Sequence, residues 1–185
     1  MSLAAFLERV VQALRAADVP FMLTGSLAAA FYGHPRATQD IDLVIEVGPE
    51  QLQRLVEQLV GAGFYVSGDA ASEALRHGGQ FNAIDPEIGW KADLIIRKTR
   101  DFSRTEFERR KSAELLGVEI ALTSLEDLII AKLEWSDLSD SELQRRDIRE
   151  ILGGSPESLD RSYLEDWIKR LGLEDAWRRV QGLTD

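Results

Sequence analysis

Three aspartates have the spacing of a cation site. Asp40 and Asp42 flank Ile41 in an alternating segment, and Asp93 lies in a later segment of the same kind. Because successive side chains of a strand point to opposite faces, Asp40 and Asp42 share one face and Ile41 takes the other. Two carboxylates held this close repel each other, and a cation between them relieves the repulsion. We therefore expect a positive ion at this face.

The ligand types predict a hard divalent cation. Mg²⁺ prefers oxygen ligands, and it usually keeps waters and substrate phosphate oxygens in its octahedron beside one or two carboxylates. Asp93, on a neighbouring predicted strand, could supply a third ligand for a two-metal arrangement that polarises the attacking and leaving oxygens. Asp40, Asp42 and Asp93 are therefore the candidate Mg²⁺ ligands and candidate catalytic residues.

Gly25 and Ser26 predict an anion-binding turn upstream of the aspartates. They join a short apolar run to a stretch of small residues, which is typical of a strand, a tight turn and a short helix. Free backbone amides and the helix dipole at such a turn favour an anion such as a triphosphate, so both residues are candidate nucleotide ligands. Each signal is weak alone, because a lone Asp-x-Asp pair is more often a turn or a surface pair.

Helices and strands must alternate to bring these residues together. Apolar residues recur at three- and four-residue steps over 3–14 and 51–60, which predicts amphipathic helices. The segments 80–84 and 92–96 predict a hairpin, whereas residues 67–79 carry no sustained period and are predicted as a loop. Further strands are predicted at 21–23, 40–47, 64–66 and 118–122, and a further helix at 101–109.

This order predicts an α+β fold in which a mixed sheet is flanked by helices. Thr123 and Ser139 each have a glutamate three residues later, which is the spacing of a reciprocal helix cap, so we expect helices to begin there. We predict an α/β core over residues 1–122 and a helical C-terminal part over residues 123–185 that packs on the core.

Composition limits the class of protein. The 185 residues are 44% apolar and 29% charged, as in ordinary globular domains. No apolar run approaches the roughly 18 residues that span a bilayer, and no signal-peptide pattern is present, so no membrane association is expected. The absence of cysteine excludes thiolate chemistry and suggests the cytoplasm. The net charge of −10 counts against a general nucleic-acid binder.

The order of the motifs resembles the nucleotidyltransferase superfamily of the polymerase-beta type. Residues 23–26 (Leu-Thr-Gly-Ser) are followed by a predicted short helix and then by residues 40–43 (Asp-Ile-Asp-Leu). Asp93 lies on a later predicted strand. Residues 33–43 (Gly-His-Pro-Arg-Ala-Thr-Gln-Asp-Ile-Asp-Leu) are similar to the abortive-infection type of toxin nucleotidyltransferase and its uncharacterised relatives. The match covers residues 20–152, and it implies a four-stranded mixed core with a helical appendage.

The resemblance extends to a lysine and a later acid in the helical part. The matching segment is 123–132 (Thr-Ser-Leu-Glu-Asp-Leu-Ile-Ile-Ala-Lys), followed by Asp147. Lys132 lies in an otherwise apolar helical stripe. The resemblance implies that Lys132 binds a nucleotide phosphate and that Asp147 positions it or acts as a base, while Glu150 replaces the usual second acid. The alternative is a structural ion pair between Lys132 and Asp147.

The other polar residues are less specific. Arg36 is a candidate nucleotide ligand, or a structural counter-ion of Asp40. His34 and His77 have no partner at metal-ligand spacing, so surface histidines are expected and no zinc site is proposed. The basic clusters 109–111 and 145–146 could meet RNA, although neighbouring acids favour a solvated helix face.

Together the residues and the resemblance imply a Mg²⁺-dependent nucleotidyltransferase. It would transfer a nucleoside monophosphate from an NTP such as ATP to a hydroxyl of a tRNA, a protein or a small molecule. A toxin of a toxin–antitoxin pair, with an antitoxin protein as partner, is a further hypothesis. The alternative is a non-catalytic nucleotide- or RNA-binding module of the same fold, which would be favoured if Asp93 pointed away from the face of Asp40 and Asp42.

Overall fold

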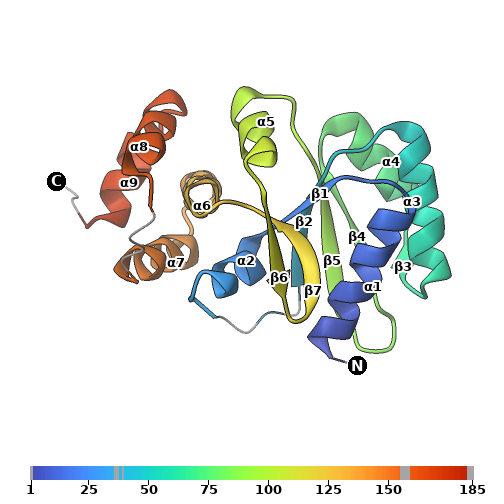
Figure 1. Ribbon diagram of the computed structural model, residues 1–185. Helices are drawn as coiled ribbons and strands as arrows, with labels where there is room; N and C mark the ends of the chain where they lie inside the picture. Colours follow the sequence, from blue (N-terminus) through green and yellow to red (C-terminus); the bar gives the residue numbers. More distant parts are fainter. Residues whose placement is uncertain (1, 36–37, 39, 155–158, 183–185) are drawn as a thin grey trace.

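The computed structural model describes residues 2–35, 38, 40–154 and 159–182, and it has the predicted α+β fold (Figure 1). Within these ranges one mixed sheet contains seven strands, so it is wider than the four-stranded core that the resemblance implies. In spatial order the strands are β3 (Tyr65–Val66), β4 (Gln80–Ile84), β5 (Lys91–Ile96), β2 (Asp40–Ile45), β1 (Phe21–Thr24), β7 (Val118–Leu122) and β6 (Lys111–Leu115).

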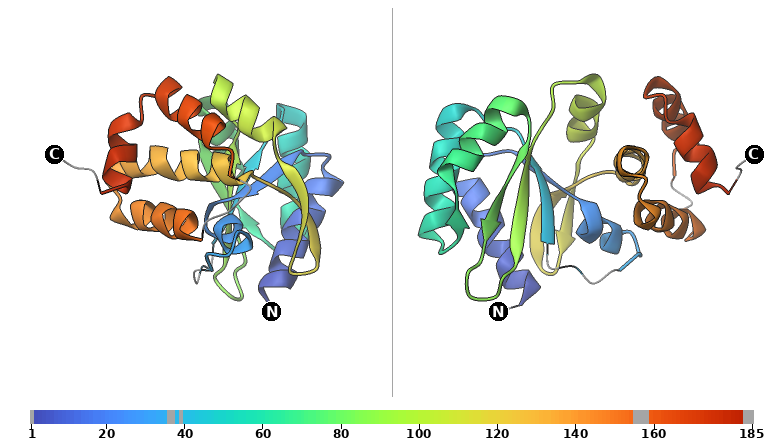
Figure 2. Two further views of the ribbon diagram at one scale, coloured as in Figure 1. Left: turned by 60° about the vertical axis from the view of Figure 1, so that its left-hand side comes forward. Right: turned by 180° about the vertical axis from the view of Figure 1, so that it is seen from behind.

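Helices cover both faces of this sheet. They are α1 (Leu3–Ala16), α2 (Gly25–Phe31), α3 (Pro49–Gly61), α4 (Gly68–His77), α5 (Asp101–Glu108), α6 (Leu125–Ser139), α7 (Glu142–Gly153), α8 (Arg161–Arg170) and α9 (Glu174–Val180). As Figure 1 and Figure 2 show, α1, α3 and α4 lie on one face, α2 and α5 on the other, and α6 to α9 beyond α2 and α5. The division of the chain at residue 122 stays a prediction.

The central strands have one buried face and one partly open face. Ile41 and Leu43 of β2 are fully buried, whereas Asp40 and Asp42 are only partly buried. β2 pairs in parallel with β5 and antiparallel with β1. The main core contains the apolar side chains between the sheet and α1 and α3 and continues into α6 to α9. Burial of the strand side chains fixes the register, because a slip by one residue would turn every apolar side chain to the wrong face.

Some predicted elements are wrong in detail. Residues 67–79, predicted as a loop, contain α4, whose buried residues are only Ala71 and Ala74. Strand β6 was not predicted. The N-cap of α6 is Ser124 rather than Thr123, and the N-cap of α7 is Ser141 rather than Ser139. In the described part of the chain, no helix has the length and apolar character needed to cross a membrane.

Candidate functional site

A row of polar residues crosses the partly open face of the sheet at the start of β2 and β5. The register pairs Thr24 with Asp42, Asp42 with Asp93, and Asp93 with Asn82. Residues paired across neighbouring strands point to the same face, and Asp40 shares this face because it lies two residues before Asp42. The sheet therefore places Asp40, Asp42 and Asp93 on the same face of two neighbouring strands.

Asp42 lies at the centre of this row. Burial raises the pKa of Asp42, and the charges of Asp93 and Asp40 raise it further. The backbone N–H of Ser26 donates a hydrogen bond to this carboxylate, and the ammonium of Lys132 on α6 acts on it, and both effects lower the pKa. The net shift is upward, which means that the negative charge of Asp42 is not fully compensated by the groups around it.

Gly25 lets this arrangement form. Its φ is +68°, in the left-handed region, where residues other than glycine are strained. A Cβ atom at this position would lie 1.9 Å from Oδ2 and 2.9 Å from Cβ of Asp42. Gly25 therefore permits both the turn into α2 and the close approach of Asp42. The sequence predicted only a phosphate contact for Gly25, so its contact with Asp42 is an additional role. The amide of Ser26, also predicted to meet phosphate, contacts Asp42 here.

Lys91 is a functional candidate that the sequence reasoning did not assign. It pairs with Asp40 across β5 and β2, and its Nζ lies 3.5 Å from Oδ2 of Asp40 and 3.1 Å from Oδ2 of Asp93. Burial alone would lower the pKa of Lys91, but its contacts with Asp93 and Asp40 outweigh this and raise it. The signal was available in the sequence, since Lys91 stands two residues before Asp93 in an alternating strand.

The donor chemistry of the row suits Mg²⁺. Asp40, Asp42 and Asp93 offer only carboxylate oxygens, and the unbalanced charge of Asp42 favours a cation beside it. Among the described residues, however, no three His, Asp or Glu side chains are already gathered as a metal site. Mg²⁺ is typically bound through one or two carboxylates, waters and substrate phosphates rather than a dedicated protein cage. The oxygen ligands therefore fit Mg²⁺ in their chemistry, and the remaining ligands would come from outside the row.

Lys132 and Asp147 form a buried ion pair between α6 and α7. Nζ of Lys132 lies 2.8 Å from Oδ2 of Asp147 and donates a second hydrogen bond, of 3.2 Å, to Oε1 of Gln144. Both charged residues are less than 10% exposed. The structural ion pair between Lys132 and Asp147 is thus present. The charge of Lys132 also acts on Asp42 and lowers its pKa. A phosphate-binding role for Lys132 and a basic role for Asp147 stay predictions, as does the role of Arg36, which lies outside the described residues.

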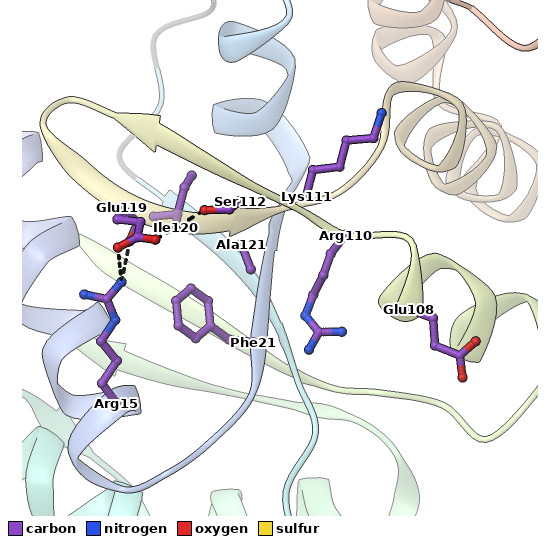
Figure 3. A pocket seen from close by; sticks show the side chains of 9 residues that line it. All are labelled: Arg15, Phe21, Glu108, Arg110, Lys111, Ser112, Glu119, Ile120 and Ala121. Atoms are coloured by element: carbon purple, nitrogen blue, oxygen red, sulfur yellow. Dashed lines mark hydrogen bonds and ion pairs between the residues drawn. The ribbon is translucent and has the colours of Figure 1, made fainter.

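Two arginines of the basic cluster 109–111 are bonded within the chain. Arg109 bonds to Asp127 and Glu126 at 3.1 Å each, and Arg110 donates to the carbonyl of Phe107. A hollow of about 430 Å³ lies beside this segment, and none of the predicted site residues lines it. Among its lining residues, the side chain of Lys111 extends away from that of Arg110 (Figure 3). Its lining residues are Arg15, Phe21, Glu108, Arg110, Lys111, Ser112, Glu119, Ile120 and Ala121.

Solved structures share this fold. The chain is similar to the antibiotic-resistance factor ANT(2'')-Ia in its solution structure, with 13% identity, a TM-score of 0.62, and 95% of this chain and 96% of that chain covered. The crystal structure of ANT(2'')-Ia with adenylyl-2''-tobramycin gives 14% identity and a TM-score of 0.52 over 99% and 97% of the two chains.

A nucleotidyltransferase-like protein from Paracoccidioides brasiliensis gives 21% identity and a TM-score of 0.53 over 94% of this chain and 91% of that chain. No family model matches the sequence, and no curated protein does. The likeness therefore confirms the nucleotidyltransferase fold, and the chemistry has to be argued from the polar row.

Proposed function

We propose that this chain, which has the nucleotidyltransferase fold, transfers a nucleoside monophosphate from an NTP to a hydroxyl acceptor with the help of Mg²⁺. The observation that carries the proposal is the pairing of Asp42 with Asp93 on adjacent parallel strands, with Asp40 on the same face. Carboxylates concentrated on one partly open face, with raised pKa at their centre, are typical of sites that bind a cation and phosphate.

Each residue then has a role that follows from its position. Asp40, Asp42 and Asp93 would hold Mg²⁺, which when bound neutralises phosphate charge and polarises the reacting oxygens. Lys132 would place its ammonium near the triphosphate, and Asp147, at 2.8 Å, positions that ammonium. Gly25 and Ser26 hold Asp42 against the start of α2. Catalysis would consist mostly of positioning and charge neutralisation.

The test is incubation of the purified protein with each α-labelled NTP, Mg²⁺ and cell extract, followed by separation of RNA, protein and small molecules. Asp42→Asn keeps the shape of the side chain and removes its charge. We expect label transfer with the native protein and a loss of at least about 100-fold in the variant, as for other groups that stabilise charge in a transition state. The fraction that carries the label identifies the acceptor class.

Asp69→Asn is the matched control, because Asp69 is exposed on α4 and the substitution removes the same charge. It should leave transfer unchanged. Equal transfer by the native protein and Asp42→Asn, or none by either with every NTP, would contradict the proposal.

The non-catalytic nucleotide- or RNA-binding module is less well supported. It would be favoured by Asp93 facing away from Asp40 and Asp42, whereas the register pairs Asp93 with Asp42. ANT(2'')-Ia, solved with adenylyl-2''-tobramycin, makes a small-molecule hydroxyl a reasonable acceptor to include in the assay.

A toxin role in the cytoplasm with an antitoxin partner is part of the proposal. Growth arrest on expression of the native chain, and not of Asp42→Asn, would support the toxin role.

A further inference from the structure

Lys91 places one ammonium between two acids of the polar row. Its Nζ lies 3.1 Å and 3.3 Å from the two carboxylate oxygens of Asp93 on its own strand. On the neighbouring strand, Oδ2 of Asp40 lies 3.5 Å away. Lys91 therefore contacts two of the three carboxylates from which a divalent cation would be bound.

Lys91 differs from Lys132 in how firmly it is held. The side chain of Lys91 is 36% exposed, whereas that of Lys132 is 5% exposed and lies between α6 and α7. A lysine ammonium is a point charge on a flexible four-carbon stem, so a partly exposed lysine can swing into solvent without breaking the packing around it. Lys132 cannot do so without leaving Asp147 buried and unpaired.

We propose that Lys91 is a displaceable counter-ion, which neutralises Asp40 and Asp93 in the absence of metal and gives way when a divalent cation binds. The proposal rests on the metal site of the proposed function and adds a regulatory property to it. An ammonium and a divalent cation cannot both lie within contact distance of the same carboxylates without strong repulsion. Lys91 therefore weakens metal binding to the free protein, and the negative charge of a triphosphate favours the exchange.

The probe is Mn²⁺ alone, titrated into the nucleotide-free protein and followed by the electron paramagnetic resonance signal of free Mn²⁺. Lys91→Met removes the competing charge and keeps much of the apolar stem. We expect this variant to bind Mn²⁺ at least about 10-fold more tightly than the native protein, because the ion no longer has to displace a cation. Lys91→Arg keeps the charge and should bind Mn²⁺ as weakly as the native protein.

Lys98→Met is the charge-matched control, since Lys98 follows the other end of β5 and is exposed. It should leave Mn²⁺ affinity within about 2-fold of the native value, because exposed charges more than a Debye length away are screened. Thermal unfolding gives a second readout. Without metal Lys91→Met should unfold at a lower temperature than the native protein, and Mn²⁺ should raise its unfolding temperature more.

A double variant separates the two ways in which the experiment can fail. If Lys91→Met with Asp42→Asn binds Mn²⁺ as tightly as Lys91→Met alone, the ion is not held by Asp42, and the metal site of the proposed function is wrong. If Asp42→Asn weakens Mn²⁺ binding but Lys91→Met binds it no more tightly than the native protein, the metal site stands and the counter-ion role of Lys91 is overturned.

Discussion

Two groups of acidic side chains differ in their surroundings. One lies on the sheet and comprises Asp40, Asp42 and Asp93; the other lies at the junction of α5, α6 and α8 and comprises Glu126 and Asp127. Asp127 is fully buried and Glu126 is 5% exposed. The acids on the sheet are more exposed, with side-chain exposures of 46% for Asp40 and 12% for Asp93. The two groups also differ in how their charges are compensated.

At the junction both oxygens of Asp127 accept hydrogen bonds. Oδ1 accepts from the hydroxyl of Tyr163 at 2.6 Å, and Oδ2 accepts from the hydroxyl of Ser124 at 2.6 Å and from Nε of Arg109 at 3.1 Å. The same guanidinium bonds to Glu126 and lies over the ring of Tyr163, 3.8 Å from its centroid. These contacts tie α8 to α6 and to the end of α5, so we regard the junction as structural.

On the sheet the compensation is incomplete. In the part of the chain that the structure describes, three carboxylates share a face with one ammonium in direct contact, that of Lys91, which contacts Asp40 and Asp93. Of the described groups, a backbone amide and a lysine that is already paired with Asp147 act on Asp42 to stabilise its charge. Binding sites in natural proteins often keep such unfavourable groups of like charges, which a bound ligand then neutralises. The comparison suggests that buried acids with every oxygen satisfied hold the fold together, whereas acids that lack charge balance bind something from outside.

The same substitution should destabilise the fold at the junction and not on the sheet. Asp127→Asn removes a charge that Arg109 and Tyr163 depend on, so we expect the free energy of unfolding to fall by about 3 kcal/mol. Asp42→Asn removes repulsion from its two neighbours, so the free energy of unfolding should stay the same or rise. Urea unfolding at neutral pH without divalent cations measures both. Equal destabilisation by the two variants would mean that the acids on the sheet and those at the junction do not differ in how their charges are compensated.

Glu106 tests whether the negative charges at the junction are all compensated. Burial, and then the charge of Asp127, raise the pKa of Glu106 from 4.5 to about 8. The folded chain then binds a proton that the unfolded chain releases between these values, so this group stabilises the fold below pH 4.5 and the contribution is lost as the pH rises through about 8. Glu106→Gln should therefore reduce the fall in unfolding free energy between pH 5 and pH 8 by about 3 kcal/mol.

Urea unfolding at the two pH values checks this, with Glu108→Gln, an exposed position of the same helix, as control. An unchanged pH dependence in Glu106→Gln would mean that the pKa of Glu106 is not raised, and that the groups around it compensate its charge.

Gly25→Ala should destabilise the fold less than Asp127→Asn does. The added Cβ overlaps Asp42, and the left-handed backbone disfavours alanine, so the free energy of unfolding should fall by between about 1 and 2 kcal/mol. Transfer activity should fall much more than stability, because the overlap displaces the carboxylate. Gly78→Ala is a matched control, since Gly78 also has positive φ, at +64°, but has no atom close to the new Cβ. Similar activity in the two variants would argue against a role for Asp42.

The sequence predicted what depends on local spacing. Asp40 and Asp42 face away from Ile41 because strand alternation requires it, and Lys132 meets Asp147 because both lie on apolar helical stripes. The pairing of Asp42 with Asp93, and the position of Lys91 opposite Asp40, depend on register between strands far apart in the chain. The helix α4 was missed because it buries only small residues, which give no clear apolar period.

The parallel pairing of β2 with β5 also bears on how the chain folds. The two strands are joined by a long crossover that includes α3, α4 and β4, and closing such a loop costs entropy before any contact repays it. Asp42 and Asp93 repel each other as the strands come together, while Lys91 and Asp40 attract at the same register. The nascent protein would thus acquire its acidic face late, and partly folded molecules would lack the paired carboxylates of that face.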